Sequence, residues 1–244
     1  MRLTTSIPRQ GTRPRYRRSL TWLMRRGQAM HPTIAQRFSA LAHEFTFNHP
    51  GGNLTGVAAL TAEIATKRLE LLHKAVPLTQ SIALLTGPAD IPRTQVETRL
   101  MQSAARTLGL RLQVINVTFD TEIAPIFATL VEQQIGAIVV GSSVIVLSKG
   151  DQIVLLAARF ALPTMFPRDL NARAGGLFSY APNVDELTRQ AGAYTGRILK
   201  GEKPADLPVA QATKFEFVIN LRTAKALGFR IPPDVLALAD EVIE

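Results

Sequence analysis

Short apolar runs that alternate with helical patterns restrict the fold of this chain more than any other feature. Each run has the length of a strand buried inside a parallel sheet, and residues that favour turns bound it. Strands and helices that alternate in this way form an open, mostly parallel sheet with helices on both faces. The five runs begin at Ser81, Leu112, Gly136, Leu162 and Gly176.

The segments around these runs carry apolar residues at helical spacing. Thr94 and Glu97 have the spacing of a capping box, which predicts that a helix begins there. A helix over 184–200, a strand over 215–219 and two short helices around 222–227 and 233–242 complete the predicted chain. The predicted inward positions are Val96, Leu100, Ala104 and Leu108 in one helix and Leu187, Ala191, Tyr194 and Ile198 in another.

Residue content excludes several kinds of catalytic and metal site. Cys is absent, which excludes disulfides, thiolate metal sites and thiol nucleophiles. The four His residues all precede position 74, and none of them has a metal-ligand spacing. We interpret Asp120 and Glu122 as partners of a helix N-terminus rather than as a catalytic pair. The sequence therefore predicts that the chain is not an enzyme and holds no metal and no cofactor.

The positive charge is confined to the front of the chain. Residues 1–45 contain nine Arg, no Lys and one acid, whereas residues 46–244 contain 7 Lys and 12 Arg against 18 acidic residues. The formal net charge of +9 thus does not indicate a nucleic-acid surface spread over the fold, and we do not expect a nucleic-acid partner. No apolar run reaches the roughly 18 residues of a transmembrane helix.

The basic segment has two interpretations. Residues 33–37 could open a DNA recognition helix, which would make the chain an effector-binding transcriptional regulator with a DNA-contacting arm. Only one helix of the required pair is visible in the sequence, which favours a basic tail over residues 1–49 that is expected to be poorly ordered. The apolar stretch at 20–24 is too short for a secretory signal, so none is predicted.

Several strings after residue 50 occur together in a specific order and spacing. They are PGGNLTG at 50–56, KRLELL at 67–72, LPTM at 162–165, GGLFSYAPN at 175–183, ILKG at 198–201, PADLPV at 204–209, TKFE at 213–216, VINL at 218–221 and TAKALG at 223–228. In this order the strings resemble the substrate-binding proteins of ABC importers, in the tryptophan/tyrosine transport branch. The resemblance covers residues 50–244.

The resemblance implies a periplasmic-binding-protein-like fold of class I, in which two Rossmann-like lobes are joined by a hinge. It places Gly51, Gly52 and Asn53 in the hinge. Because only 49 residues precede this hinge, we expect the second lobe to be complete and the first lobe to be largely missing, as in a truncated chain. The implied parts are a tail (1–49), a hinge and connecting helix (50–80), a complete βα lobe (81–183) and a returning segment with the C-terminal hinge and helices (184–244).

Candidate binding residues follow the strands, because open α/β sheets bind ligands outside the carboxyl ends of their strands. The loops there hold hydroxyls, amides and a few aromatic side chains, which suit a small polar or zwitterionic molecule. Ser179 and Tyr180 would hold a ligand carboxylate or ring, and Phe166 would stack on an aromatic ligand. The candidate ligand-binding residues are Thr86, Ser142, Ser143, Phe166, Ser179 and Tyr180.

The function implied by the resemblance is that of a solute-binding component of an ABC importer. It would bind a small molecule, for which an amino acid is one candidate, between two lobes and without chemistry. Its partners would be ABC permease subunits, and its location would be the periplasm. A chain with no recognisable signal peptide is also compatible with a cytoplasmic location and with a truncated, inactive copy.

Overall fold

A computed structural model describes residues 53–59 and 61–244. These residues belong to one compact unit of the chain, residues 47–244. The predictions for the basic tail, for the DNA-contacting arm and for Gly51 and Gly52 lie outside the described residues. No helix within the described part of the chain is long and apolar enough to cross a membrane.

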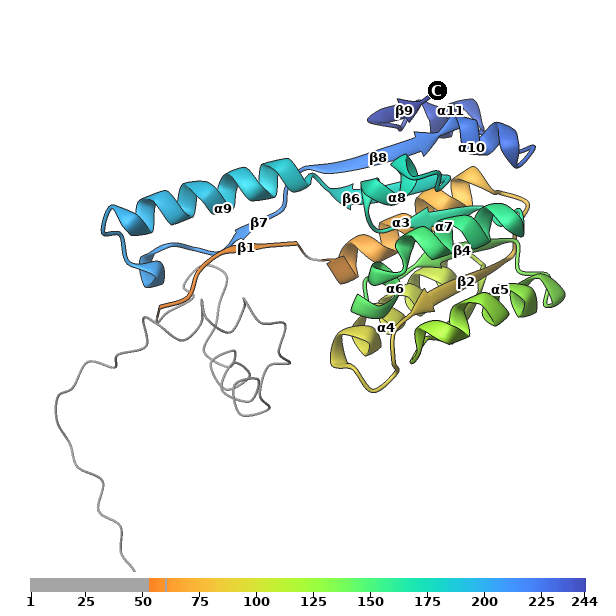
Figure 1. Cartoon of the computed structure of the whole chain (residues 1–244), viewed down its shortest axis with the longest axis horizontal. Helices are drawn as coiled ribbons and strands as arrows, with labels where there is room; N and C mark the ends of the chain where they lie inside the picture. Colours follow the sequence, from red (N-terminus) through yellow and green to blue (C-terminus); the bar gives the residue numbers. More distant parts are fainter. Residues whose placement is uncertain (1–52, 60) are drawn as a thin grey trace, which may run out of the picture. The chain divides into compact units, whose positions relative to one another are not determined.

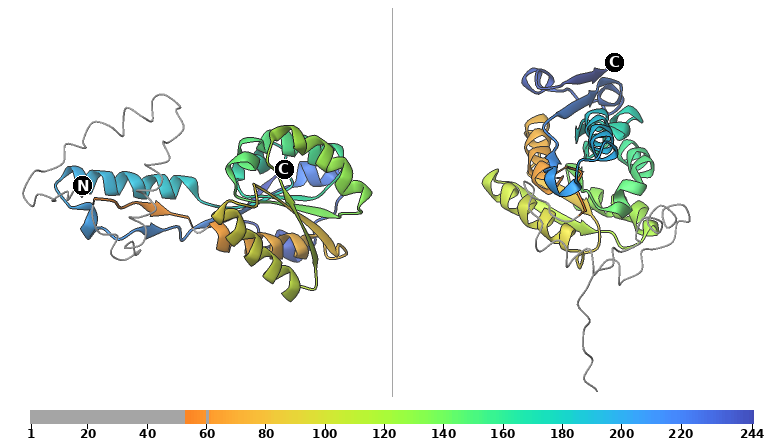
Figure 2. Two further views of the ribbon diagram at one scale, coloured as in Figure 1. Left: turned by 90° about the horizontal axis from the view of Figure 1, so that it is seen from below. Right: turned by 90° about the vertical axis from the view of Figure 1, so that its left-hand side faces the viewer.

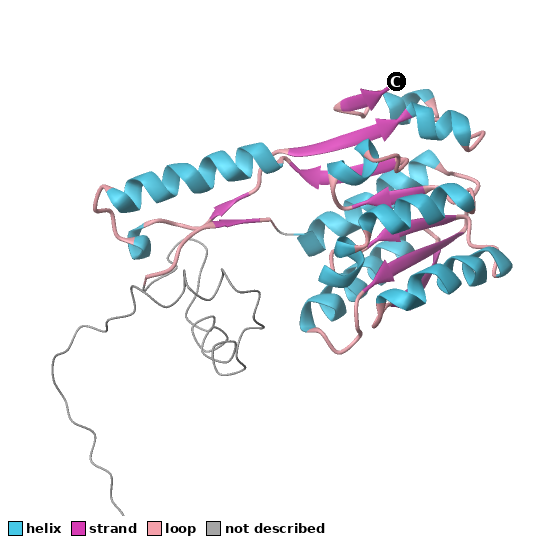
Figure 3. Ribbon diagram, in the orientation of Figure 1, coloured by secondary structure: helices cyan, strands magenta, loops and turns pink. Residues whose placement is uncertain are grey.

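Among the described residues, seven strands form the main sheet in the order β3-β2-β4-β5-β6-β8-β9 (Figures 1 and 3). The first five are parallel, β8 is antiparallel to β6, and β9 is parallel to β8. The predicted α/β class is confirmed, and each predicted run contributes a strand. The strands are β2 (Ser81–Thr86), β3 (Arg111–Asn116), β4 (Ala137–Val140), β5 (Thr164–Phe166), β6 (Phe178–Pro182), β8 (Phe215–Asn220) and β9 (Glu241–Ile243).

Helices cover both faces of this sheet (Figure 2). Successive side chains of a strand point to opposite faces, so Leu84 packs in the cluster with α3 and α4 while Leu85 packs in the cluster with α5 and α7. The central strands β2 and β4 are therefore buried on both sides. The helices are α3 (Thr61–Ala75), α4 (Pro92–Thr107), α5 (Ile123–Glu132), α6 (Val144–Ser148), α7 (Gly150–Arg159), α8 (Asp169–Arg173), α10 (Leu221–Ala226) and α11 (Pro233–Leu236).

Helix α4 differs from its prediction at its start and in the face that it buries. It begins at Pro92, a residue type that is favoured in the first helical turn, and has no side-chain cap. Thr94 and Glu97 consequently lie inside the helix and do not form the predicted capping box. The predicted inward face is displaced by about one position, since Val96 is 47% exposed. The buried residues of α4 are Thr94, Glu97, Met101 and Ala105.

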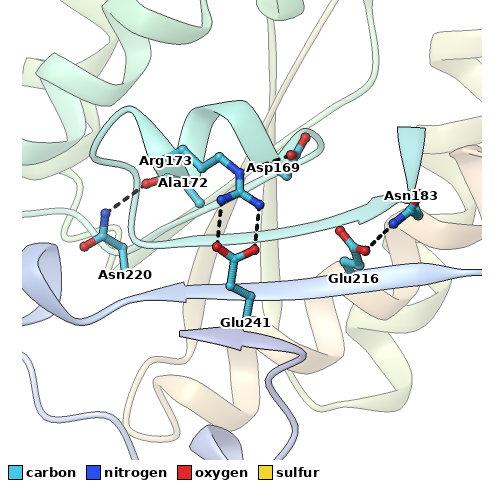
Figure 4. Close-up of polar contacts among 7 residues, drawn as sticks. All are labelled: Asp169, Ala172, Arg173, Asn183, Glu216, Asn220 and Glu241. Carbon is cyan, nitrogen blue, oxygen red and sulfur yellow. Dashed lines mark hydrogen bonds and ion pairs between the residues drawn. The ribbon is translucent and has the colours of Figure 1, made fainter. Parts of the chain in front are cut away.

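The C-terminal end also differs from its prediction. The helix predicted over 233–242 ends at Leu236, and the chain then forms β9 on the edge of the sheet. The guanidinium of Arg173 on α8 donates two hydrogen bonds of 2.6 Å to the carboxylate of Glu241 (Figure 4). A bidentate pair of this kind fixes both partners, and together with the backbone pairing to β8 it holds this segment as a strand.

Four elements outside the main sheet form what we call the extension: β1 (Val57–Ala58), α9 (Val184–Leu199), η2 (Pro204–Asp206) and β7 (Ala210–Gln211). β1 and β7 pair in parallel, and α9 contacts β1 (Figure 1). The helix predicted over 184–200 is thus present. No residue of α9 is buried, so its predicted apolar face is at least partly exposed.

Candidate functional site

Two cavities adjoin at the carboxyl edge of the main sheet, where β2, β4, β5 and β6 end. Each has a volume of about 400 Å³ or slightly less, and both are lined by Arg93 and Ser142. We call one the α9-side cavity, because Val184 and Leu187 of α9 line it together with Leu147 and Leu170. The other, the α4-side cavity, is lined by Thr94 and Glu97 of α4 and by Ser142, Ser143 and Val144 after β4.

A buried carboxylate joins the ends of two strands beneath these cavities. Glu97 accepts a hydrogen bond of 3.1 Å from the hydroxyl of Thr86 at the end of β2 and one of 3.0 Å from the backbone N–H of Ser142 after β4. Gly141 makes this approach possible, because a Cβ atom there would lie 2.8 Å from both Glu97 Oε2 and Thr86 Oγ1. Glu97 therefore fixes the strand ends that form the floor of the site.

Arg68 supplies a buried positive charge beside Glu97. Its side chain is 0% exposed; Nε donates to the backbone oxygen of Tyr180 at 2.8 Å, and Nη1 donates to the hydroxyl of Ser142 at 3.3 Å. Burial lowers the pKa of Arg68 to about 10, while the nearby Glu97 carboxylate opposes that shift. The guanidinium thus stays charged at neutral pH and ties α3 to the ends of β4 and β6.

One nitrogen of this guanidinium is not used by the protein. Nη2 of Arg68 is buried and has no hydrogen-bond partner among the described residues, and Arg68 lines the α9-side cavity. A buried polar group without a partner costs free energy. The arrangement therefore leaves an unused charged donor beside a cavity whose other lining residues are seven with apolar side chains and the polar residues Arg93, Ser142, Arg168, Asp169 and Asp185.

The structure brings three of the six predicted binding residues together. Thr86 and Ser142 belong to the hydrogen-bonded network around Glu97, and Ser143 lines the α4-side cavity with a buried hydroxyl that has no partner in the described part of the chain. A Cβ atom at Gly87 would lie 2.6 Å from Ser143 Cβ, so this turn also packs closely because a side chain is absent.

The other three predicted residues point elsewhere. Phe166 is fully buried in the cluster with α5 and α7, and Ser179 is fully buried in β6. The ring of Tyr180 stacks on Phe215 with 5.8 Å between the centroids. Side chains alternate along a strand, so residues near a strand end can face the core rather than the cavity. Tyr180 reaches the site through its backbone oxygen, which accepts from Arg68.

Sequence reasoning missed Arg68 and Glu97. Arg68 lies on the same helical stripe as the buried residues Ala65, Leu69 and Leu72, and Glu97 lies on the stripe of Met101. A charged residue on an inward apolar stripe is a signal of a buried polar network, because such residues are rarely buried without a partner. The helical spacing does not indicate the hydrogen-bond partners of Arg68, since Ser142 is 74 positions away in the sequence.

The connection from the main sheet to the extension is held by side chains (Figure 4). Asn183, at the end of β6, caps α9 by accepting from the backbone N–H of Glu186 at 2.7 Å and donates from its amide to Glu216 of β8. The chain also passes between the extension and the sheet from β1 to α3 and from β7 to β8. Asn53, a predicted hinge residue, lies in an exposed turn before β1.

One protein family matches most of this chain. The sequence profile described as "ABC transporter substrate binding protein" matches residues 39–243. A curated relative, the tyrosine-binding protein of Clostridioides difficile strain R20291, is 21% identical over 181 residues, which are 74% of this chain and 51% of the relative. The chain thus spans about half the length of this relative.

Solved structures show the same fold. The ABC domain from Streptococcus pneumoniae in complex with L-Trp is 28% identical, with a TM-score of 0.71, over 81% of this chain and 67% of that chain. A conserved domain protein from Vibrio cholerae is 23% identical, with a TM-score of 0.72, over 81% of this chain and 65% of that chain. The arrangement of strands and helices described above is therefore shared with periplasmic-binding-protein-like structures.

Proposed function

The chain belongs to the family of ABC transporter substrate-binding proteins, and on that premise we propose that it is the solute-binding component of an importer. The family expected from the resemblance is thereby confirmed. In this proposal the chain binds a small molecule at the carboxyl edge of its main sheet and performs no chemistry on it. ABC permease subunits as partners and a location in the periplasm or outside the cell follow from the family and belong to the same proposal.

The observation that carries this proposal is the pair of cavities that adjoin at Ser142. Small-molecule sites are concave and mostly apolar, with a few polar groups that orient the ligand. The α9-side cavity combines the apolar side chains of Leu147, Leu170 and Leu187 with the charged Arg68. It also lies outside the carboxyl ends of the strands, where open α/β sheets bind their ligands.

An amino acid with a large apolar side chain is the ligand that we propose. The solved relative from Streptococcus pneumoniae is in complex with L-Trp, and the curated relative is named as a tyrosine-binding protein. A cavity of about 380 Å³ with Leu147, Leu170 and Leu187 in its lining offers room and apolar contact for an aromatic side chain. The hydroxyl of Ser142, which lines the same cavity, would contact the polar end of the ligand.

Ligand binding by closure of a hinge is part of the proposal. Three connections join the extension to the main sheet: β1 to α3, β6 to α9 and β7 to β8. In this proposal the extension moves about these connections and about the predicted hinge residues Gly51, Gly52 and Asn53. A ligand that contacts α9 and the strand ends together would stabilise a closed arrangement, because only that arrangement offers both sets of contacts.

Filling the α9-side cavity tests the proposal. Leu147→Trp places a larger side chain in this cavity, whereas Leu155→Trp makes the same change on α7 at a position that is 72% exposed. We expect isothermal titration with L-tryptophan and L-tyrosine to show at least about tenfold weaker binding for the first variant and unchanged binding for the second. Equal affinity of both variants would contradict binding in this cavity.

A further inference from the structure

The unused nitrogen of Arg68 is the feature of the site that the fold itself does not explain. Nε has a partner in β6 and Nη1 has one just after β4, and both hydrogen bonds span more than 70 positions of sequence. These two bonds fix the plane of the guanidinium before any ligand arrives. Nη2 is left with two N–H donors and no partner among the described residues, and Arg68 is one of the residues that line the α9-side cavity.

The charges around this nitrogen indicate what it can bind. The α9-side cavity is lined by Arg68, Arg93 and Arg168 and by the carboxylates Asp169 and Asp185. Three guanidinium groups against two carboxylates leave one net positive charge in this lining, which a ligand with one negative charge balances and a dianion such as a phosphate monoester exceeds. A planar carboxylate matches the fixed fork of a guanidinium better than a neutral carbonyl, because charge-assisted hydrogen bonds are shorter and stronger.

We propose that Arg68 determines the specificity of the site for a carboxylate, with Nη2 donating to the carboxylate oxygen of the bound molecule. This inference rests on the proposed function and adds to it the group that the site recognises and the residue that recognises it: the ligand carboxylate is preferred over the corresponding amide because of Arg68. Arg68 then has two roles, because the same guanidinium that binds the ligand holds the ends of β4 and β6 in place.

Rejection of the amide has a physical cause in this geometry. The amide of the same molecule can accept a hydrogen bond from Nη2 but brings no charge to a buried cation. A charged donor discriminates against a ligand that offers it only a neutral acceptor, because the hydrogen bond to the neutral acceptor is weaker. We expect the Kd of the amide to be at least about tenfold higher than that of the acid. This ratio corresponds to the lower end of the range of free energies measured for hydrogen bonds to charged groups.

A pair of probes that differ at one group tests this inference. L-Tryptophan and L-tryptophanamide share the indole and the α-amino group and differ in the carboxylate alone. In the ¹⁵N-labelled whole chain, NMR titration gives the Kd of each probe and reports the Nε–H resonance of Arg68. We expect L-tryptophan to bind at least tenfold more tightly, and at saturation to shift the Arg68 resonance further than the amide does.

Two variants separate specificity from structure. Arg68→Gln should reduce the ratio of the two Kd values towards one, whereas a purely structural role would weaken both probes alike and preserve the ratio. Arg106→Lys, at an exposed position of α4, should leave the ratio unchanged. Should Arg68→Gln fail to fold, the comparison of the two probes in the native chain still decides.

The outcomes distinguish this inference from the function on which it rests. Equal Kd values for acid and amide, or an unchanged ratio in Arg68→Gln, would overturn the role of Arg68 while leaving solute binding intact. Perturbation of cavity resonances without a shift at Arg68 would do the same. No perturbation by either probe would overturn the proposed function and this inference together.

Discussion

Arg68 on α3 donates from Nη1 to the hydroxyl of Ser142, which follows β4, across 3.3 Å in a fully buried position. The backbone N–H of the same serine donates to Glu97 on α4. Ser142 thus links a buried cation and a buried anion that belong to two different helices. Because this link forms the floor of both cavities, it connects the stability of the sheet edge to the binding site.

Removing the hydroxyl of Ser142 tests this link. In Ser142→Ala the bond to Glu97 remains, but Nη1 of Arg68 loses its acceptor in a buried position. We expect the free energy of unfolding to fall by about 1–3 kcal/mol, the cost of leaving a buried donor unpaired. Urea unfolding measures this change, and Ser148→Ala, at an exposed serine, is the matched control that should have almost no effect.

Neutralising Glu97 should also destabilise the chain. Glu97→Gln removes a negative charge that favours the charged form of Arg68 and replaces one buried acceptor oxygen by a donor, so we expect a loss of about 1–3 kcal/mol. The exposed residue Glu132 on α5 provides the control, because Glu132→Gln changes the same group in solvent. In a double-mutant cycle with Arg68→Gln, the combined loss should be smaller than the sum of the two single losses. Additive losses would show that the two charges do not interact.

Substitution by alanine should have opposite effects on stability at two glycines, Gly141 and Gly192. Gly141→Ala places a Cβ atom 2.8 Å from Glu97 Oε2 and Thr86 Oγ1, so we expect a loss of about 1–3 kcal/mol. Gly192→Ala, on α9, meets no atom within 4 Å and should stabilise the helix by about 0.5–1 kcal/mol. Thermal unfolding of both variants measures the difference, and a harmless Gly141→Ala would show that the floor of the site is loosely packed.

We expect the stability of the chain to depend on pH because of Glu186 in the first turn of α9. Hydrogen bonds from Arg189 and Gln190 lower the pKa of Glu186 to about 2 from its ordinary value of 4.5. A carboxyl whose folded pKa is depressed stabilises the fold above pH 4.5, and this contribution is lost as the pH falls towards 2. The Tm of Glu186→Gln should therefore be lower than that of the native chain at pH 6, and the two should converge near pH 2. A constant difference in Tm would contradict this origin.

The fold was largely predictable from the sequence, because β2 and β4 consist almost entirely of apolar residues between turn-forming ones. β9 was not, since Glu241–Ile243 has no strand-like run of its own and depends on β8 and on the pair between Arg173 and Glu241. The start of α4 was misplaced because a serine or threonine cap and a first-turn proline are competing signals, and here Pro92 prevailed.

The candidate site was predictable in place but only partly in detail. The rule that ligands bind at the carboxyl edge identified Thr86, Ser142 and Ser143, which follow adjacent parallel strands. It could not identify Arg68 or Glu97, which reach the same edge from helices. Nor could it foresee that the side chains of Phe166 and Ser179 lie in the core, because the side of the sheet on which each lies is set by register.

Intermolecular NOEs between L-tryptophan and the leucine methyl groups test the central claim most directly. We expect NOEs from the indole protons to Leu147, Leu170 and Leu187, which line the α9-side cavity. Leu155 and Leu199, which are exposed on α7 and α9, should show none. NOEs to these exposed leucines, or none to the cavity leucines at a saturating ligand concentration, would contradict ligand binding at the carboxyl edge of the sheet.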